Sequence, residues 1–284
     1  MDSKVGIYFQ ALRIKHYVKG VVILAPMLFI LGELRLKDIV ASIALFIGFS
    51  LITSSIYTFN DIRDAADDRN DPFVKMRPYA NGLISFSEMV SLTLGSLVLG
   101  LIVFSTLSLE AGSRNKIFAY TFLYILINLS YSGLRLKRFK LLGMIMVGVG
   151  FPIRFLLGST LLGINNLKFI TFLIFLLSLL VIAGKRYYRG LNMGKSTDWE
   201  RIFHSLIYFN ILAYLVFVTY SILGEGKSSL LILTTPLLWA ILQRFKAIVH
   251  NSKVVKDLSI VFLFDKYIIF YGMIFSLILL FCYS

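Results

Sequence analysis

The sequence predicts an all-α polytopic membrane protein, a bundle of about nine transmembrane helices. Two observations support this prediction. Hydrophobic residues make up 58% of the 284 residues, well above the roughly 45–50% of a typical soluble domain. Apolar runs long enough to cross a bilayer core of about 30 Å as helices also recur along the whole chain. A membrane protein is therefore favoured over a soluble globular domain.

The apolar runs follow one another with no linker, low-complexity tract or exact repeat between them. The first nineteen residues are amphipathic and basic and lack the continuous apolar core of a cleavable signal peptide. We therefore expect the first run to remain as a transmembrane helix, and residues 1–284 to form a single integral-membrane domain. The nine expected spans lie at about 20–34, 39–58, 84–107, 116–132, 141–162, 166–183, 202–223, 228–243 and 267–283.

The formal net charge of +14 is explained by membrane orientation better than by nucleic-acid binding. Alternate loops differ strongly in their basic content, and the loops on one side hold only Arg35, Lys37, Arg114, Lys116, Lys168 and Lys227. By the positive-inside rule the other side is cytoplasmic. We expect an integral protein of the cell membrane with a cytoplasmic N-terminus, an external C-terminus and no nucleic-acid partner. The sequence leaves both a monomer and a homo-oligomer open.

The stretch NDIRDAADDRND, residues 60–71, follows the second apolar run and holds five of the 15 acidic residues. On an α-helix, residues three, four or seven apart share a face, so three or four of these carboxylates are expected to converge. Like charges this close need a positive partner. Mg²⁺ takes oxygen ligands, usually one or two carboxylates plus substrate phosphates. The alternative is a solvated acidic helix end.

Basic residues return directly after the acids, in PFVKMRPYANG, with Lys75 and Arg77. Carboxylates can hold a metal ion, and Lys and Arg can bind phosphate oxygens. Placed side by side, the two sets of residues indicate a site for a metal-bound diphosphate. The charged loops on this side also lead us to expect that the active site faces the cytoplasm.

Three further segments carry candidate anion-binding residues. In YSGLRLKRFK, residues 131–140, we favour Tyr131, Arg135 and Lys137, whereas Arg138 and Lys140 fit an anchor at the membrane surface. Arg154 in GFPIR lies inside an apolar run. An ionisable residue there indicates a functional site, and snorkelling to the interface is the alternative.

GKRYYRG, residues 184–190, begins where the sixth expected span ends. Lys185 and Arg186 are therefore expected at a helix C-terminus. There they would either complement the helix dipole or bind phosphate, and the sequence favours neither role.

With these residues in view, the chain resembles the UbiA superfamily of membrane-embedded transferases over essentially its whole length. NDIRDAADD matches the NDxxDxxxD motif of that superfamily through Asn60, Asp61, Asp64 and Asp68. The chain is most similar to the branch that transfers phosphoribosyl groups to decaprenyl phosphate. The segments LRIKHYVKGVVILAP, KMRPYANG, YSGLRLKRF, GFPIRFLLGS and AGKRYY resemble that branch in the same order.

The resemblance implies transfer of a phosphoribosyl group from phosphoribosyl pyrophosphate to a polyprenyl phosphate, with Mg²⁺ as cofactor. It implies catalytic roles for Asp61, Asp64 and Asp68, and metal binding by Asn60, Asp64 and Asp68. It also implies phosphate binding by Lys75, Arg77, Tyr131, Lys137, Lys185 and Arg186. We expect Lys19, Arg135 and Arg154 to join them in binding the substrates.

Two other functions stay open. One is a prenyltransferase that moves an isoprenoid from its diphosphate to an aromatic or other small acceptor. The other is a non-catalytic lipid-binding or transport protein. The chain departs from the branch pattern where an acid is usual, with Gly143 after the LK segment and Arg189 after GKR. Both departures lie in the second half of the expected site. They affect the predicted identity of the donor and the acceptor more than the predicted fold.

Overall fold

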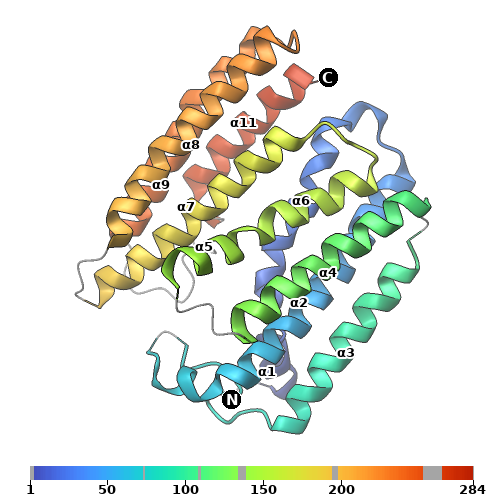
Figure 1. Cartoon of the computed structure of the whole chain (residues 1–284), viewed down its shortest axis with the longest axis vertical. Coiled ribbons are helices and arrows are strands. Elements are labelled where there is room, and N and C mark those ends of the chain that lie inside the picture. Colours follow the sequence, from blue (N-terminus) through green and yellow to red (C-terminus); the bar gives the residue numbers. More distant parts are fainter. Residues whose placement is uncertain are drawn as a thin grey trace. The chain divides into compact units, whose positions relative to one another are not determined.

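The computed structural model describes residues 3–72, 74–107, 110–133, 139–193, 198–251 and 264–283. Within these ranges every regular element is a helix and no strand occurs (Figure 1). The predicted all-α fold is confirmed. Residue contacts divide the chain into two compact units. The first comprises residues 1–27, 34–146 and 153–165, and the second comprises residues 28–33, 147–152 and 166–284.

Seven helical segments of the described chain are long and apolar enough to cross a membrane. The expected run at 116–132 lies on helix α4 (Ala111–Gly133), whose tyrosines, asparagines and serines lower its hydropathy. The expected run at 20–34 falls on short 3₁₀ helices, η1 (Ile14–Ile23), η2 (Ala25–Phe29) and η3 (Leu31–Glu33). The count of nine spans therefore stays a prediction. The seven segments are Leu36–Asn70, Phe86–Ser105, Lys140–Leu161, Lys168–Asn192, Asp198–Leu223, Ser229–Asn251 and Lys266–Tyr283.

Helix α2 (Leu36–Asn70) is the central element of the first unit and carries the acidic stretch at its C-terminal end. Its 35 residues correspond to about 52 Å, well beyond the roughly 30 Å of a bilayer core. Residues 59–70, which follow the second expected span, continue the same helix. The acidic side chains therefore project from a rigid helix end that extends the second apolar run.

Helices α2 and α3 (Phe86–Ser105) pack backbone to backbone. A Cβ atom built on Gly100 would lie 2.8 Å from the carbonyl oxygen of Gly48. Small residues that permit such close approach are typical of membrane helix pairs, as are hydroxyl contacts between helices. Thr93 Oγ1 donates to Thr58 Oγ1 at 2.8 Å across the same interface. This packing fixes the direction of the α2 end that bears the acids.

The first unit also contains α1 (Lys4–Ala11), the start of α5 (Lys140–Gly148) and most of α6 (Gly150–Leu161). Gly158 of α6 lies against the chain at Ile23, where an added Cβ atom would overlap the Ile23 carbonyl oxygen. The glycine is therefore what allows α6 to approach η1.

The second unit consists mainly of α7 (Lys168–Asn192), α8 (Asp198–Leu223), η5 (Ser229–Leu233), α9 (Thr234–Asn251) and α11 (Lys266–Tyr283). Gly184 lets α7 approach its neighbours, since a Cβ atom there would lie 2.9 Å from Phe245 and 3.0 Å from Phe203. The prediction that a helix ends near residue 184 is wrong. Helix α7 continues to Asn192, because the interior contacts of its last turns hold the helix together beyond the apolar run.

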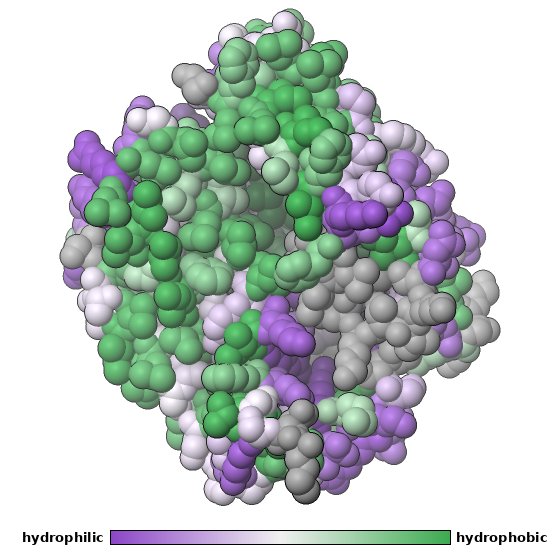
Figure 2. All heavy atoms as spheres, turned by 180° about the vertical axis from the view of Figure 1, so that it is seen from behind, coloured by the Kyte–Doolittle hydropathy of each residue, from purple (hydrophilic) through white to green (hydrophobic). Residues whose placement is uncertain are grey.

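Large apolar side chains are exposed along several helices. They recur every three or four residues, and Figure 2 shows hydrophobic atoms over much of the visible face. Soluble monomers rarely expose apolar patches this extensive. These surfaces suit contact with lipid. Examples are Leu94, Val98 and Leu101 on α3, Leu212, Val216 and Tyr220 on α8, and Phe270, Met273, Leu277 and Phe281 on α11.

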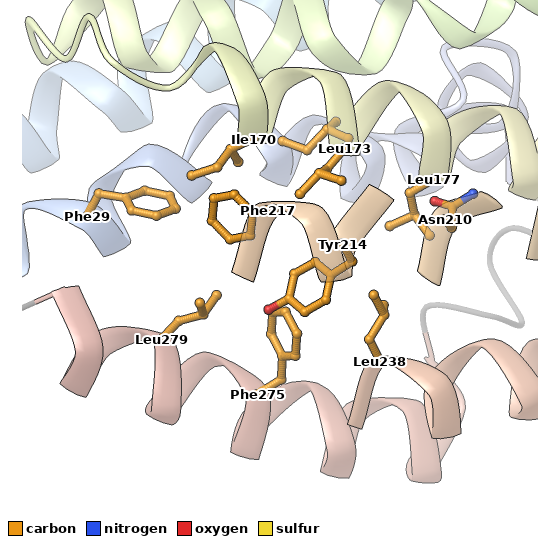
Figure 3. A pocket seen from close by; sticks show the side chains of 11 residues that line it. Phe29, Ile170, Leu173, Leu177, Asn210, Tyr214, Phe217, Leu238, Phe275 and Leu279 are labelled. Carbon is orange, nitrogen blue, oxygen red and sulfur yellow. The ribbon is translucent and has the colours of Figure 1, made fainter. Parts of the chain in front are cut away.

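The second unit contains an apolar cavity of about 180 Å³, lined by α7, α8, α9, α11 and Phe29 of η2 (Figure 3). Its lining is hydrocarbon and aromatic apart from Asn210 and the Tyr214 hydroxyl. Both polar groups are already engaged, since Asn210 Nδ2 donates to the Leu206 carbonyl and Tyr214 Oη donates to Thr234 Oγ1. This cavity has no group suited to a phosphate, so the candidate site must be sought elsewhere.

Candidate diphosphate site

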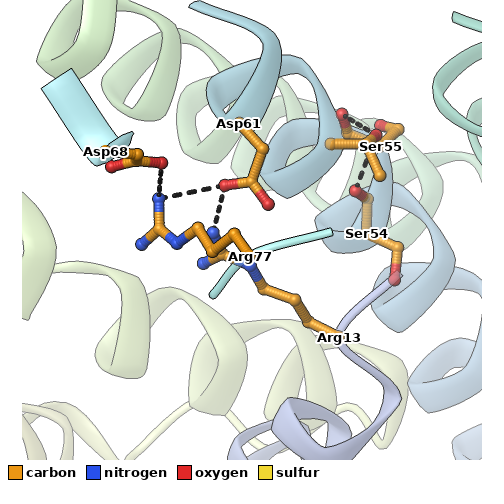
Figure 4. Close-up of polar contacts among 7 residues, drawn as sticks. Arg13, Ser54, Ser55, Asp61, Asp68 and Arg77 are labelled. Carbon is orange, nitrogen blue, oxygen red and sulfur yellow. Dashed lines mark hydrogen bonds and ion pairs between the residues drawn. The ribbon is translucent and has the colours of Figure 1, made fainter. Parts of the chain in front are cut away.

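Two buried aspartates at the end of α2 share one guanidinium group. Arg77 donates from Nη1 to Asp68 Oδ2 at 2.6 Å and to Asp61 Oδ1 at 3.1 Å (Figure 4). Asp61 is 3% exposed and Asp68 7%. Carboxylates buried this deeply require a positive partner. In this structure Arg77 supplies that charge.

A second guanidinium reaches Asp61 from the N-terminal segment. Arg13 forms an ion pair through Nη2 with Asp61 Oδ1, the same oxygen that accepts from Arg77. The Arg13 guanidinium also lies 4.8 Å from the centre of the Tyr57 ring, one turn before Asp61 on α2. Asp61 is therefore paired with two arginines, one that precedes it in the sequence and one that follows it.

The backbone of Arg13 adopts a conformation that is uncommon for a residue with a side chain. Its φ of 53° and ψ of 44° fall in the left-handed region, and it is the only non-glycine residue with positive φ in the part of the chain that the structure describes. Ser54 Oγ donates to the Leu12 carbonyl at 2.7 Å, and Tyr17 Oη lies 3.0 Å from the same hydroxyl. These contacts with α2 hold the turn between α1 and η1.

Helix α1 is itself fastened to α3, through Glu88. Lys4 Nζ and Tyr8 Oη approach Glu88 Oε1 at 2.8 and 2.7 Å. The hydrogen bond to Glu88 raises the pKa of Lys4, and a hydrogen bond to the same carboxylate raises the pKa of Tyr8. Glu88 also completes a capping box with Ser85, whose amide donates to Glu88 Oε2 at 2.9 Å. Arg13 thus follows a helix with a defined position.

The segment that bears Arg77 is tied to the end of α2. The Lys75 amide donates to the Asp71 carbonyl at 2.8 Å, and Arg69 Nε donates to the Ala80 carbonyl at 3.3 Å. Pro78 and Ala80 are buried. Lys75 itself is exposed. The turn after α2 therefore directs Arg77 back onto the acidic face.

The donor set at the helix end suits Mg²⁺. Asn60 Oδ1 is buried and accepts no hydrogen bond from the described residues. Asp64 is half-buried, and Asp68 lies two turns after Asn60 on the same face. Amide and carboxylate oxygens are the ligands that Mg²⁺ prefers. Asn60, Asp64 and Asp68 therefore fit the metal in their chemistry.

The expected convergence of three or four carboxylates stays a prediction, and in this structure two of them, Asp61 and Asp68, meet at one guanidinium. Within the described ranges, no group of three His, Cys, Asp or Glu residues is close enough to hold a metal ion unaided. Arginine pairing accounts for this, because Asp61 is turned toward Arg13 and Arg77. A metal ion here would need phosphate oxygens to complete its ligands, as Mg²⁺ commonly does.

Arg154, the expected substrate-binding residue of α6, lies in a different group. It is 6% exposed, donates from Nη2 to Tyr124 Oη at 2.9 Å, and lies 5.3 Å from the centre of the Phe49 ring. Snorkelling is therefore not what the structure shows. Phe49 precedes Asp61 by twelve residues, or about 18 Å along α2, so the structure does not bring Arg154 to the aspartates.

The remaining expected residues are placed as follows. Lys19 is half-buried on η1, and Tyr131 is half-buried in the last turn of α4. In the second unit, Lys185 and Arg186 lie inside α7, where the Arg186 guanidinium covers the Trp199 ring at 4.7 Å. Arg135 and Lys137 fall outside the described residues, so their role stays a prediction.

Two further positions bear on the departures from the branch pattern. Gly143 lies within α5, and Arg189 lies in the last turn of α7. Arg13 was not predicted as a site residue. Its signal in the sequence is that it lies six residues before Lys19 in the same segment, LRIKHYVKGVVILAP.

Comparison with known proteins identifies the family of this chain. The family model for the UbiA prenyltransferase family matches residues 21–265. The chain is 30% identical over 182 residues to the decaprenyl-phosphate phosphoribosyltransferase of Mycolicibacterium smegmatis, covering 63% of this chain and 55% of that protein. The corresponding Mycobacterium tuberculosis protein is 28% identical over 182 residues, with coverage of 63% and 58%. The chain thus spans a little over half the length of the curated relatives it matches.

Solved structures show the same fold. A UbiA homologue from Archaeoglobus fulgidus bound to DMAPP and Mg²⁺ has a TM-score of 0.66 at 17% identity, covering 95% of this chain and 96% of that one. The same homologue bound to GPP and Mg²⁺ gives 0.64 at 18% identity, with 96% of each chain covered. The resemblance noted in the sequence is confirmed. This chain belongs to the UbiA prenyltransferase family, whose members are integral membrane proteins.

Proposed function

We propose that this chain is a membrane-embedded transferase that moves a phosphoribosyl group from phosphoribosyl pyrophosphate to a polyprenyl phosphate, with Mg²⁺ as cofactor. The observation that carries the proposal is the shared guanidinium of Arg77 on buried Asp61 and Asp68. Carboxylates for a metal and an arginine for phosphate are thereby combined at one helix end. The names of the relatives support the phosphoribosyl group as the one transferred.

The reaction is a substitution at the anomeric carbon of the donor. The bond from this carbon to the diphosphate oxygen breaks, and the diphosphate leaves with the electron pair. A bond forms between the same carbon and a phosphate oxygen of the lipid. Negative charge grows on the leaving group, so electrostatic stabilisation there lowers the barrier most.

The residues of the helix end suit this task. Mg²⁺, when bound, supplies positive charge to the leaving diphosphate oxygens, and Asn60, Asp64 and Asp68 are the residues that would hold it. Arg77 donates hydrogen bonds in a planar fork that matches phosphate oxygens. Lys75 is exposed beside it and adds a second cation. Together the two basic residues would orient the donor.

A membrane position follows from the proposed acceptor. A polyprenyl chain stays in the bilayer while its phosphate reaches the surface. The apolar outer faces of the helices and the polar end of α2 provide these two environments in one protein. A cytoplasmic orientation of that end follows from the distribution of Lys and Arg between the loops.

A direct assay tests the proposal. Purified protein with Mg²⁺ is incubated with labelled phosphoribosyl pyrophosphate and polyprenyl phosphate, and the lipid fraction is analysed for label. We expect a lipid-linked phosphoribose that disappears when the metal is chelated and in the Asp64→Ala and Asp68→Ala variants. Absence of this product, with correctly folded protein, would contradict the proposal.

A prenyltransferase is the second candidate, favoured by the solved relatives bound to GPP or DMAPP and Mg²⁺. The same residues would bind the metal and the diphosphate in this reaction. Here too a diphosphate departs from a carbon that can bear positive charge, in this case the allylic carbon of the prenyl donor. Prenyl diphosphates with an aromatic acceptor form the second arm of the assay. Activity in that arm alone would select this candidate. No activity in either arm, with ligand binding unchanged in Asp64→Ala and Asp68→Ala, would select a non-catalytic lipid-binding protein.

A further inference from the structure

We propose that Arg77 is a resident cation that neutralises Asp68 until a metal-bound diphosphate arrives, and that Arg13 and Asp61 form the anchor that keeps Arg77 in place during the exchange. The inference rests on the proposed function in one respect, namely that the ligand is a diphosphate with a divalent cation. It adds a competition between Arg77 and the metal, and a positioning role for Arg13.

The competition follows from the occupancy of Asp68. Arg77 Nη1 lies 2.6 Å from Asp68 Oδ2, and the Asp68 carboxylate is almost entirely buried. A divalent cation that uses this carboxylate must replace the guanidinium as its main positive partner, because both seek the same oxygen lone pairs. Arg77 therefore opposes binding of the metal alone.

The released guanidinium has a second acceptor that holds it nearby. Its contact with Asp61 Oδ1, at 3.1 Å, does not involve Asp68. Arginine has five N–H donors, so Arg77 can keep Asp61 and turn other donors to phosphate oxygens. Arg77 therefore favours binding of the metal together with a diphosphate.

Asp61 can serve as an anchor because Arg13 already neutralises it. The Arg13–Asp61 pair is well shielded, with 17% and 4% of the two side chains exposed. The left-handed backbone of Arg13 is a strained conformation that persists because its surroundings hold it. Ser54 at the Leu12 carbonyl and the Tyr57 ring beneath the guanidinium provide that hold. Asp61 is thus committed to arginine and is not a metal ligand.

Binding measurements without turnover test the exchange. Full-length protein in detergent is titrated with Mn²⁺ alone, followed by electron paramagnetic resonance, and then with inorganic pyrophosphate at saturating Mn²⁺, followed by calorimetry. For Arg77→Gln we expect Mn²⁺ alone to bind at least about threefold tighter, and pyrophosphate to bind about tenfold weaker. These opposite signs are the signature of exchange, since a general structural defect would weaken both.

Matched variants separate exchange from long-range charge and from misfolding. Arg63→Gln removes the same charge from an exposed position at the same helix end and should leave both affinities within about twofold of the parent, because the Arg63 side chain donates to the Gly133 carbonyl. Arg77→Lys keeps the charge and should leave the affinity for Mn²⁺ near that of the parent. Thermal unfolding identifies any variant that fails to fold.

The anchor has its own test. Arg13→Gln should weaken pyrophosphate binding at saturating Mn²⁺ by about threefold or more, and Arg13→Lys should restore part of the loss.

Unchanged Mn²⁺ affinity in Arg77→Gln, or equal weakening of both ligands, would overturn the exchange. Unchanged pyrophosphate binding in Arg13→Gln would overturn the anchor. If Arg77→Gln shows the opposite changes in affinity but the protein transfers no phosphoribosyl group, the proposed function alone is refuted. If the protein transfers the group but the opposite changes are missing, this inference alone is refuted.

Discussion

Arg77 Nη1 donates to Asp68 Oδ2 at 2.6 Å, although Asp68 lies in the last turn of α2 and Arg77 follows the helix by seven residues. The ion pair holds the turn after α2 against the acidic face of the helix. The position of this turn therefore determines whether Asp68 has a positive partner.

This pair should be measurable as a coupling energy. Removing Arg77 leaves the buried Asp68 without its main positive partner, so Arg77→Gln should lower the free energy of unfolding by about 1–3 kcal/mol. Asp68→Asn alone should cost a similar amount or less. In the double variant the two effects should fall short of their sum. Thermal or denaturant unfolding in detergent provides the measurement, and strict additivity would show that the pair contributes nothing.

Asn60 should distinguish a metal ligand from a structural residue. Its buried Oδ1 accepts no bond from the described residues, so Asn60→Ala should leave the unfolding temperature unchanged or slightly higher. The Mg²⁺ concentration for half-maximal transfer should rise by about tenfold or more, because even residues that only orient a metal ligand typically contribute about 10- to 100-fold. A marked loss of stability with unaltered Mg²⁺ dependence would indicate a structural role.

Gly158 should tolerate no side chain. A Cβ atom there would overlap the Ile23 carbonyl oxygen, so Gly158→Ala must displace α6 or η1. Overpacking of this kind costs about 1–3 kcal/mol or more. The matched control is Gly95→Ala in α3, where an added Cβ atom meets nothing within 4 Å. That variant should be more stable by about 0.5–1 kcal/mol, because alanine is the better helix former. Equal effects of the two substitutions in thermal unfolding would contradict this packing.

Asp265 should make stability depend on pH in the acidic range. It precedes α11, accepts from the amides of Tyr267 and Ile268, and pairs with Arg244 at 2.8 Å. The hydrogen bond from Arg244 lowers the pKa of Asp265 below its ordinary value of 3.8. A carboxyl group with a depressed pKa in the folded state contributes stability above its unfolded pKa and loses it as the pH falls through the folded value.

Asp265→Asn isolates that contribution, since asparagine retains the helix cap and loses the charge. At pH 6 the variant should be less stable than the parent by about 1 kcal/mol or less, as expected for a partly exposed ion pair. The difference should shrink once the pH falls below 3.8. Unfolding temperatures recorded between pH 6 and pH 3 test this, and a difference that is constant with pH would exclude the charge as its cause.

Much of the fold could be predicted because hydrophobic runs and helical spacing are local properties. The apolar runs located the long helices, and NDxxDxxxD spacing placed Asn60, Asp64 and Asp68 on one face of α2. Helix ends were less predictable. Helix α7 continues past Gly184 because its next residues pack against other helices, a contribution that hydropathy does not contain.

The sequence by itself determined an all-α membrane protein with an acidic helix end and basic residues after it. Only the tertiary structure decided which cation meets which carboxylate. Arg13 and Asp61 are 48 residues apart in sequence, and their ion pair depends on the docking of α1, the left-handed turn at Arg13 and the bond from Ser54 to Leu12. Contacts of this kind arise from packing between distant segments. For that reason the composition of the acidic stretch indicated a charge partner, and the folded chain identified Arg77 and Arg13.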